Sequence, residues 1–85
     1  MNRVLTPNLR TVIDGDRAVI MNTARNTMTT LDVMGGFIWG QLEQGLSDDE
    51  IESALAERTG EDAQVIKRDL QEFFEQLAKE HLLIV

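Results

Sequence analysis

The stretch Thr27-Met28-Thr29-Thr30-Leu31-Asp32-Val33-Met34-Gly35-Gly36-Phe37-Ile38-Trp39 separates two halves of the chain that have different hydrophobic periods. Upstream of it, short alternating runs are separated by Asn, Asp and Gly, which is typical of strands and turns. Downstream, apolar residues recur every three or four positions, which is typical of helices. The sequence therefore predicts an α+β domain in which strands come first and helices follow.

Three strands are predicted before this boundary. Leu9 to Asp14 and Ala18 to Met21 lie on either side of Asp14-Gly15-Asp16, a tight turn in which glycine supplies a positive φ. The third run, Thr27 to Leu31, is rich in β-branched residues and follows a second polar turn. We therefore expect a three-stranded antiparallel meander.

The third of these strands has the features of an unprotected sheet edge. Thr27 to Leu31 carries no charge and lacks the Lys or Pro that often shields an edge strand. Its backbone N–H and C=O groups would then be free to pair with another strand. We expect the protein to work at this edge.

Three helices are predicted after the boundary, each beginning at a capping residue. Asp32 and Asp62 suit the N-cap positions of the first and third helices. Ser47 and Glu50 form a capping box for the second helix. The glycines that end the first two helices are Gly45 and Gly60.

Apolar spacing predicts which faces are buried. The buried stripe expected for the third helix consists of Ile66, Leu70, Phe73 and Leu77. Phe74 lies on the flank of that stripe, where it either packs over the core or lines a groove. Trp39 is expected in the core, and the apolar tail from Leu82 to Val85 either pairs with a strand edge or closes the core.

Two adjacent glycines, Gly35 and Gly36, lie inside the first predicted helix. Each costs a helix about 1 kcal/mol relative to Ala. We expect close approach of another backbone or side chain to compensate for this cost.

Composition limits the kind of protein this is. The 85 residues suit one domain, 1–85, with a small core, and the absence of Cys excludes disulfides and thiolate sites. Apolar runs are too short for a signal peptide or a membrane span, so we expect a cytoplasmic protein with no membrane partner. The net charge is −7, and residues 31–85 carry thirteen acids against four bases, which argues against a nucleic-acid partner.

Candidate catalytic and metal-binding residues are few. His81 is the only histidine, and a position near a helix end explains it without catalysis. Ser47 is explained as a cap, and Asp48-Asp49-Glu50 lacks the spacing of a calcium loop. We therefore expect a binding protein with no catalytic residue, no metal and no cofactor.

The residues from Leu31 to Trp39 resemble the Leu-Asn-x-Thr-Gly-Ala-x-Ile-Trp pattern of PqqD-like proteins, which recognise the leader peptides of ribosomally synthesised precursors. Asp32, Met34 and Gly36 depart from that pattern, although Asp32 preserves a helix cap. The resemblance covers nearly the whole chain from about Leu9. The further positions that match the family are Leu42, Gly45, Ser47, Ile51, Leu55, Ile66, Asp69, Leu70, Phe73, Leu77 and Leu82.

The resemblance implies a winged-helix-like fold in which a leader peptide adds as a strand beside the third strand and fills a groove against the third helix. The residues expected to contact it are Thr27, Met28, Thr29, Thr30, Leu31, Lys67, Leu70 and Phe74. The other flank of the third helix would offer Val65, Asp69 and Gln76 instead, and the sequence leaves this choice open.

Within the family, the chain is most similar to the small leader-binding proteins of lasso-peptide clusters, and a pyrroloquinoline quinone pathway is the alternative. The lasso resemblance implies two partners besides the leader: a cysteine-protease-like leader peptidase and, as a further candidate, a cyclase. A winged-helix DNA-binding regulator is the runner-up from a different functional class. The acidic third helix disfavours it, because nucleic-acid binding relies on Lys and Arg.

Overall fold

The sheet and the helices follow one another along the chain. The computed structural model describes residues 4–15 and 17–84. In chain order the elements are β1 (Val4–Leu5), β2 (Leu9–Asp14), β3 (Arg17–Asn22), β4 (Thr27–Leu31), α1 (Val33–Glu43), α2 (Asp48–Thr59), α3 (Ala63–Lys79) and β5 (Leu83–Ile84). The predicted α+β fold, with three antiparallel strands followed by three helices, is confirmed.

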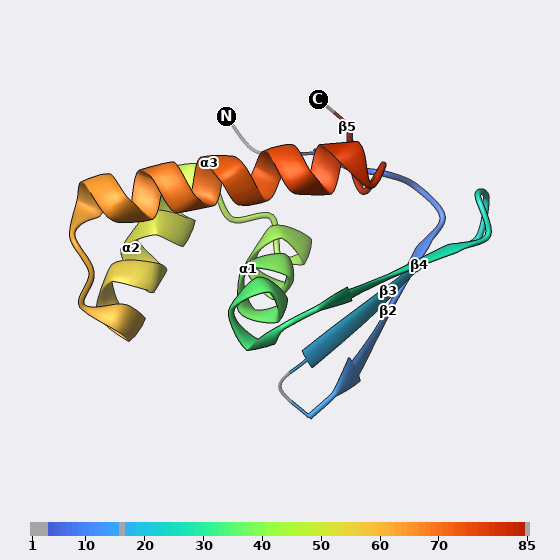
Figure 1. The fold of residues 1–85 in the computed structure, drawn as a ribbon, viewed down its shortest axis with the longest axis horizontal. Coiled ribbons are helices and arrows are strands. Elements are labelled where there is room, and N and C mark those ends of the chain that lie inside the picture. The colour runs from blue at the N-terminus through green and yellow to red at the C-terminus, as the bar shows by residue number, and fades with distance from the viewer. Residues whose placement is uncertain (1–3, 16, 85) are drawn as a thin grey trace.

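The helices lie on one side of the sheet (Figure 1). The long helix α3 runs along one side of the molecule, and α2 packs beneath the end of α3 that is farther from the sheet. Helix α1 lies between α3 and the sheet, where it contacts β3 and β4. One face of the sheet therefore contributes to the core, and the other faces outward.

The sheet has the order β2-β3-β4, with both pairs antiparallel. Strand β3 is one residue longer at each end than the sequence predicts. On its inner face Ala18 and Ile20 are fully buried, and Ala18 lies opposite Leu31 of β4. Burial of Leu31 fixes the register, because a shift by one residue would turn its side chain to the outer face.

All three predicted helix caps are present. The side chain of Asp32 accepts a hydrogen bond from the N–H of Gly35 at 2.8 Å, and Asp62 caps α3 in the same way. Ser47 and Glu50 form the reciprocal capping box of α2. Hydrogen bonds with Ser47 lower the pKa of the Glu50 carboxyl. The bond with the Ser47 backbone has the larger effect, and the bond with its side chain has the smaller one.

Trp39 joins α1 to the far strand of the sheet. It is only 1 % exposed, so its predicted core position is confirmed. Its indole N–H donates to Oγ1 of Thr11 at 2.9 Å, and that hydroxyl donates to Glu43 at 2.9 Å. This chain of hydrogen bonds satisfies the polar atom of a buried indole and connects the C-terminal half of α1 to strand β2.

The C-terminal tail fulfils both of the roles that the sequence left open. Leu83 and Ile84 pair with Val4 and Leu5 as a small antiparallel sheet, β1-β5. Leu82 and Leu83 are also buried in the core. Val85, the last residue of the predicted tail, lies outside the described residues.

The predicted close approach at the paired glycines is found at Gly35. A Cβ atom there would lie 3.2 Å from the carboxylate of Asp32 and 3.3 Å from both Leu31 and the ring of Phe73. Glycine at this position therefore lets α1 approach the end of β4 and the side of α3.

Two general features limit the kinds of site that the structure offers. In residues 4–15 and 17–84, no helix is long and apolar enough to cross a membrane. The same residues contain no group of three or more His, Asp or Glu side chains that could hold a metal ion.

Two of the three glycines of α1, Gly35 and Gly40, allow a test of this packing. A Cβ atom at Gly40 would meet no atom within 4 Å, so Gly40→Ala should raise the free energy of unfolding by about 0.5–1 kcal/mol through helix propensity alone. Gly35→Ala gains the same helix propensity, but its new Cβ atom crowds atoms of Asp32, Leu31 and Phe73. The substitution should therefore stabilise the fold less than Gly40→Ala does, or destabilise it. Urea denaturation of both variants measures the difference. Equal stabilisation would show that the contacts at Gly35 are not restrictive.

Candidate functional site

The edge of the sheet at β4 is the first part of the candidate site. Strand β4 pairs with β3 on one side, and in the described part of the chain no strand pairs with its other side. The predicted free edge is therefore present in the structure. A free strand edge is a template for pairing with another chain.

The pairing of β2 with β3 shows which backbone groups of β3 point toward β4. The N–H of Thr23 donates to the C=O of Asn8 at 3.1 Å, next to the last pair of this ladder. Hydrogen-bonded and non-hydrogen-bonded pairs alternate along an antiparallel ladder. The β3 residues that bond toward β2 are therefore Arg17, Val19 and Met21, and the residues between them bond toward β4.

The free backbone groups of β4 follow from this alternation. Ile20 lies opposite Thr29, so Thr29 and its alternate residues on β4 bond inward to β3. The N–H and C=O groups of Met28 and Thr30 must then point outward from the sheet. The free edge thus offers two N–H donors and two C=O acceptors. A partner strand can pair with them in either the antiparallel or the parallel direction.

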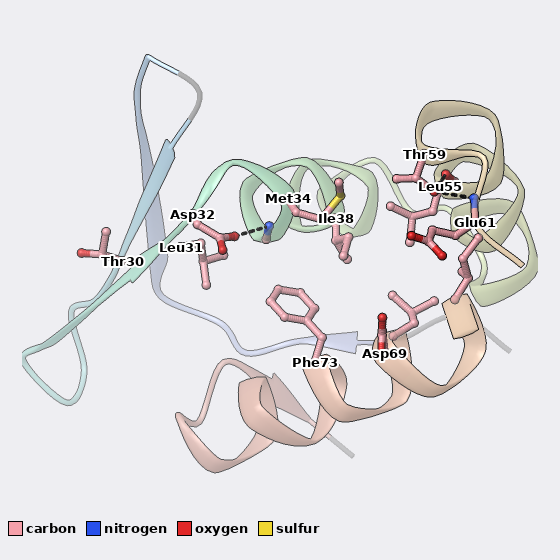
Figure 2. Close-up of a pocket in the computed structure, with 13 residues that line it drawn as sticks. Thr30, Leu31, Asp32, Met34, Ile38, Leu55, Thr59, Glu61, Asp69 and Phe73 are labelled. Carbon is pink, nitrogen blue, oxygen red and sulfur yellow. Dashed lines mark hydrogen bonds between the residues drawn. The ribbon is translucent and has the colours of Figure 1, made fainter. Parts of the chain in front are cut away.

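An open groove of about 650 Å³ adjoins this edge (Figure 2). It lies between the end of β4, the N-terminal half of α1, the C-terminal end of α2 and one flank of α3. The residues that line it are Thr30, Leu31, Asp32, Met34, Gly35, Ile38, Leu55, Thr59, Glu61, Ile66, Asp69, Leu70 and Phe73. A groove of this size accommodates side chains of a bound peptide.

The groove is mainly apolar. Leu31 and Leu70 are buried, while Met34 and Phe73 are partly exposed. Figure 2 shows the ring of Phe73 projecting from α3 toward α1 and the end of β4. Because Gly35 has no side chain, α1 can lie close to this ring.

Three carboxylates also line the groove. Asp32 is held in place by its N-cap hydrogen bond to Gly35. Asp69 is 64 % exposed and has one distant ion pair, with Arg68 at 3.8 Å. Glu61 lies in the connection between α2 and α3. The polar part of the groove is therefore acidic.

Comparison with known proteins places this chain and its fold in a family. Residues 17–83 match the PqqD family, described as coenzyme PQQ synthesis protein D. The chain belongs to the PqqD family. No curated protein matches it with significance.

A solved structure resembles this PqqD-family chain over nearly its whole length. It is TbiB1 in complex with the TbiA(β) leader peptide, with a TM-score of 0.91 and 29 % sequence identity. The alignment covers 94 % of this chain and 93 % of the TbiB1 chain. The likeness agrees with the predicted PqqD-like fold.

The structure brings some of the predicted contact residues of this PqqD-family chain together and separates others. Thr30, Leu31 and Leu70 line the groove beside the free edge. Thr27 and Met28 are exposed on β4 outside the groove, and Thr29 is half-buried between them and Thr30. Lys67 is exposed on α3 and does not line the groove, so its predicted role gains no support from the geometry.

The prediction that Phe73 belongs to the buried stripe is wrong, and of the two positions left open for Phe74 the structure shows the one in the core. Phe74 is 4 % exposed and belongs to the core, whereas Phe73 is half-buried and lines the groove. At 100° per residue, Phe73 lies about 40° to one side of the mean direction of Ile66, Leu70 and Leu77, and Phe74 lies about 60° to the other side. Helical spacing therefore favours Phe73 over Phe74 for the core by a small margin, and packing reverses that order. The groove opens on the flank that carries Phe73 and Asp69, one of the two flanks that the sequence left open.

Several lining residues carry no sequence signal for binding. Met34 and Ile38 belong to the apolar stripe of α1, so their spacing predicts core positions. Thr59 and Glu61 lie at the end of α2, far from β4 in sequence. Only the tertiary packing of α2 against α3 brings them to the groove.

The exchanged positions of the two phenylalanines predict different effects of truncation. Phe74→Ala removes a core ring and should lower the free energy of unfolding by about 3–5 kcal/mol. Phe73→Ala should cost clearly less, because its ring is partly solvated, while it widens the groove and weakens any ligand held there. Urea denaturation and peptide titration of the two variants measure both effects. A larger stability loss for Phe73→Ala would contradict the assignment.

Proposed function

We propose that this protein is a non-catalytic adaptor that binds the leader peptide of a ribosomally synthesised precursor as an added strand at β4. The observation that carries the proposal is the free edge of β4 beside an apolar groove. The relative TbiB1, of the same fold, has been solved in complex with the TbiA(β) leader peptide. Strand addition of this kind gives affinity through main-chain bonds and specificity through side-chain pockets.

The geometry of β4 divides the leader peptide into two sets of side chains. Leader residues opposite Thr29 and Leu31 share the inner face and point toward the groove. Leader residues opposite Met28 and Thr30 share the outer face of the sheet and point away from the helices. The groove therefore contacts the side chain of every second leader residue.

Backbone bonding alone does not account for tight binding. Up to four new ladder bonds at Met28 and Thr30 contribute a net of about 1 kcal/mol each. Ordering a flexible peptide costs about 2–5 kcal/mol, which offsets most of that gain. Apolar leader side chains in the groove must then supply the remaining affinity, with Leu31, Leu70 and Phe73 as their main contacts.

The adaptor's role is completed by a partner enzyme that acts on the bound leader. In the lasso-peptide branch, which the sequence most resembles, this partner is a cysteine-protease-like leader peptidase, with a cyclase as a further candidate. Holding the precursor near the peptidase raises its effective concentration without any catalytic group in this chain. The outer face of the sheet is available for such a contact, since Val12 and Met28 there are 49 % and 68 % exposed.

A pair of substitutions at Met28 tests strand addition. Met28→Pro removes an outward N–H that the sheet itself does not use, so it should leave the fold intact and weaken leader binding at least several-fold. Met28→Ala removes the same side chain but keeps the N–H, and should bind nearly as the wild type does. Affinity is measured by titrating synthetic leader peptide and following backbone amide shifts.

The amide shifts also locate the binding site. We expect them at β4 and at the groove flank of α3. Equal affinity of Met28→Pro and Met28→Ala would rule out main-chain pairing at this residue. No saturable shift with the leader of the cognate precursor, or shifts centred on the exposed face of α2, would overturn the proposed function.

Presentation to the peptidase makes a separate prediction. Addition of this protein should accelerate leader removal from a full-length precursor, because it raises the local concentration of substrate. It should not accelerate cleavage of a precursor whose β4-binding segment has been scrambled. Cleavage is followed by mass spectrometry with the purified peptidase. Equal acceleration of both precursors would show that the leader is not presented through this site.

A further inference from the structure

We propose that the groove selects leader peptides that place a basic residue, Lys or Arg, between Asp69 and Glu61. This inference rests on the proposed function, since it assumes that the leader fills the groove beside β4. It adds a charge requirement to a site that otherwise selects apolar side chains. The residue concerned is one of the inward-facing leader residues, beyond the position opposite Leu31.

The first argument is the sign of the charges around the groove. Asp32, Glu61 and Asp69 line it, and none of the Lys, Arg or His residues in the described part of the chain does. Figure 2 shows Glu61 and Asp69 on the side of the groove formed by α2 and α3, with Asp32 on the side formed by β4. An acidic leader residue would meet only repulsion here.

The second argument is that two of these carboxylates can accept further hydrogen bonds or form an ion pair. Asp32 already accepts the capping hydrogen bond from Gly35. Among the described residues, Asp69 has only the 3.8 Å contact with Arg68, and both side chains of that pair are more than 60 % exposed. Within residues 4–15 and 17–84, Glu61 makes no side-chain hydrogen bond or ion pair. A leader cation between Asp69 and Glu61 would therefore not have to displace a strong internal partner.

The third argument is the orientation of α2. Its C-terminal end opens onto the groove through Leu55 and Thr59. The carbonyl groups at a helix C-terminus carry partial negative charge and favour a nearby cation. The basic residue of the last turn, Arg58, has its guanidinium 4.6 Å from the ring of Phe37, which is not part of the groove. The helix end thus adds to the negative potential of the two carboxylates.

The apolar walls of the groove make Lys or Arg a better fit than a small cation. The long aliphatic part of either side chain can cover Ile66 and Leu70 while its charged end reaches the rim. The partly exposed rim limits the strength of each ion pair, so the effect is one of selectivity added to strand pairing.

The test combines a peptide scan with matched charge variants of the protein. The probe is the synthetic leader peptide of the cognate precursor, made with Lys, norleucine or Glu at each inward-facing position in turn. Norleucine keeps the aliphatic length of lysine without its charge. At one position beyond Leu31 we expect the order Lys, then norleucine, then Glu, with a preference for Lys that falls as salt is raised.

The protein variants identify the carboxylates that cause the preference. The double variant Asp69→Asn with Glu61→Gln should bind the Lys peptide about three- to tenfold more weakly and should bind the norleucine peptide unchanged. Glu72→Gln, on α3 but outside the groove, is the matched control and should leave the preference for Lys unaltered.

The outcomes separate this inference from the proposed function. If every leader version binds and none of the scanned positions prefers Lys, the charge selection is wrong and leader binding stands. A preference for Lys that survives in the double variant would likewise overturn the assignment to Asp69 and Glu61. If no version binds wild-type protein, the proposed function itself fails.

Discussion

The unsatisfied backbone of β4 is the constraint on which the site depends. Leu31 must be buried opposite Ala18, and this register leaves the N–H and C=O groups of Met28 and Thr30 outside the sheet. Asp32 then ends the strand by capping α1, so the helix turns away and does not cover the edge. The same residues that join the sheet to the helices therefore keep one edge available for pairing.

Local features of the fold were predictable because they depend on neighbouring residues. Alternation identified β2 and β4 at their observed bounds, and the caps at Asp32, Ser47 and Asp62 located the helix starts. The β1-β5 pair is different, since its two-residue strands lie at opposite ends of the chain. Neither segment is long enough to show a period, and only the tertiary structure brings them together.

The candidate site was predictable to a lesser extent for the same physical reason. The free edge follows from the composition of β4, which is local. The flank of α3 that faces the groove depends on how α1, α2 and α3 pack, whereas spacing placed Phe73 in the buried stripe and Phe74 on its flank. Packing reversed this order, with Phe74 in the core and Phe73 at the groove, and it also brought Glu61 to the groove from a distant part of the sequence.

Gly35 shows how closely fold and site are coupled in so small a domain. A helix loses about 1 kcal/mol by having glycine in place of alanine, and nothing in α1 itself recovers that loss. The absent side chain instead lets the ring of Phe73 lie beside α1, where an added Cβ atom would be only 3.3 Å from it. A larger residue would have to push α1 away from α3 or turn the ring into the groove. Either movement would change the space next to the free backbone of β4, so a residue without a side chain helps to set the width of the groove.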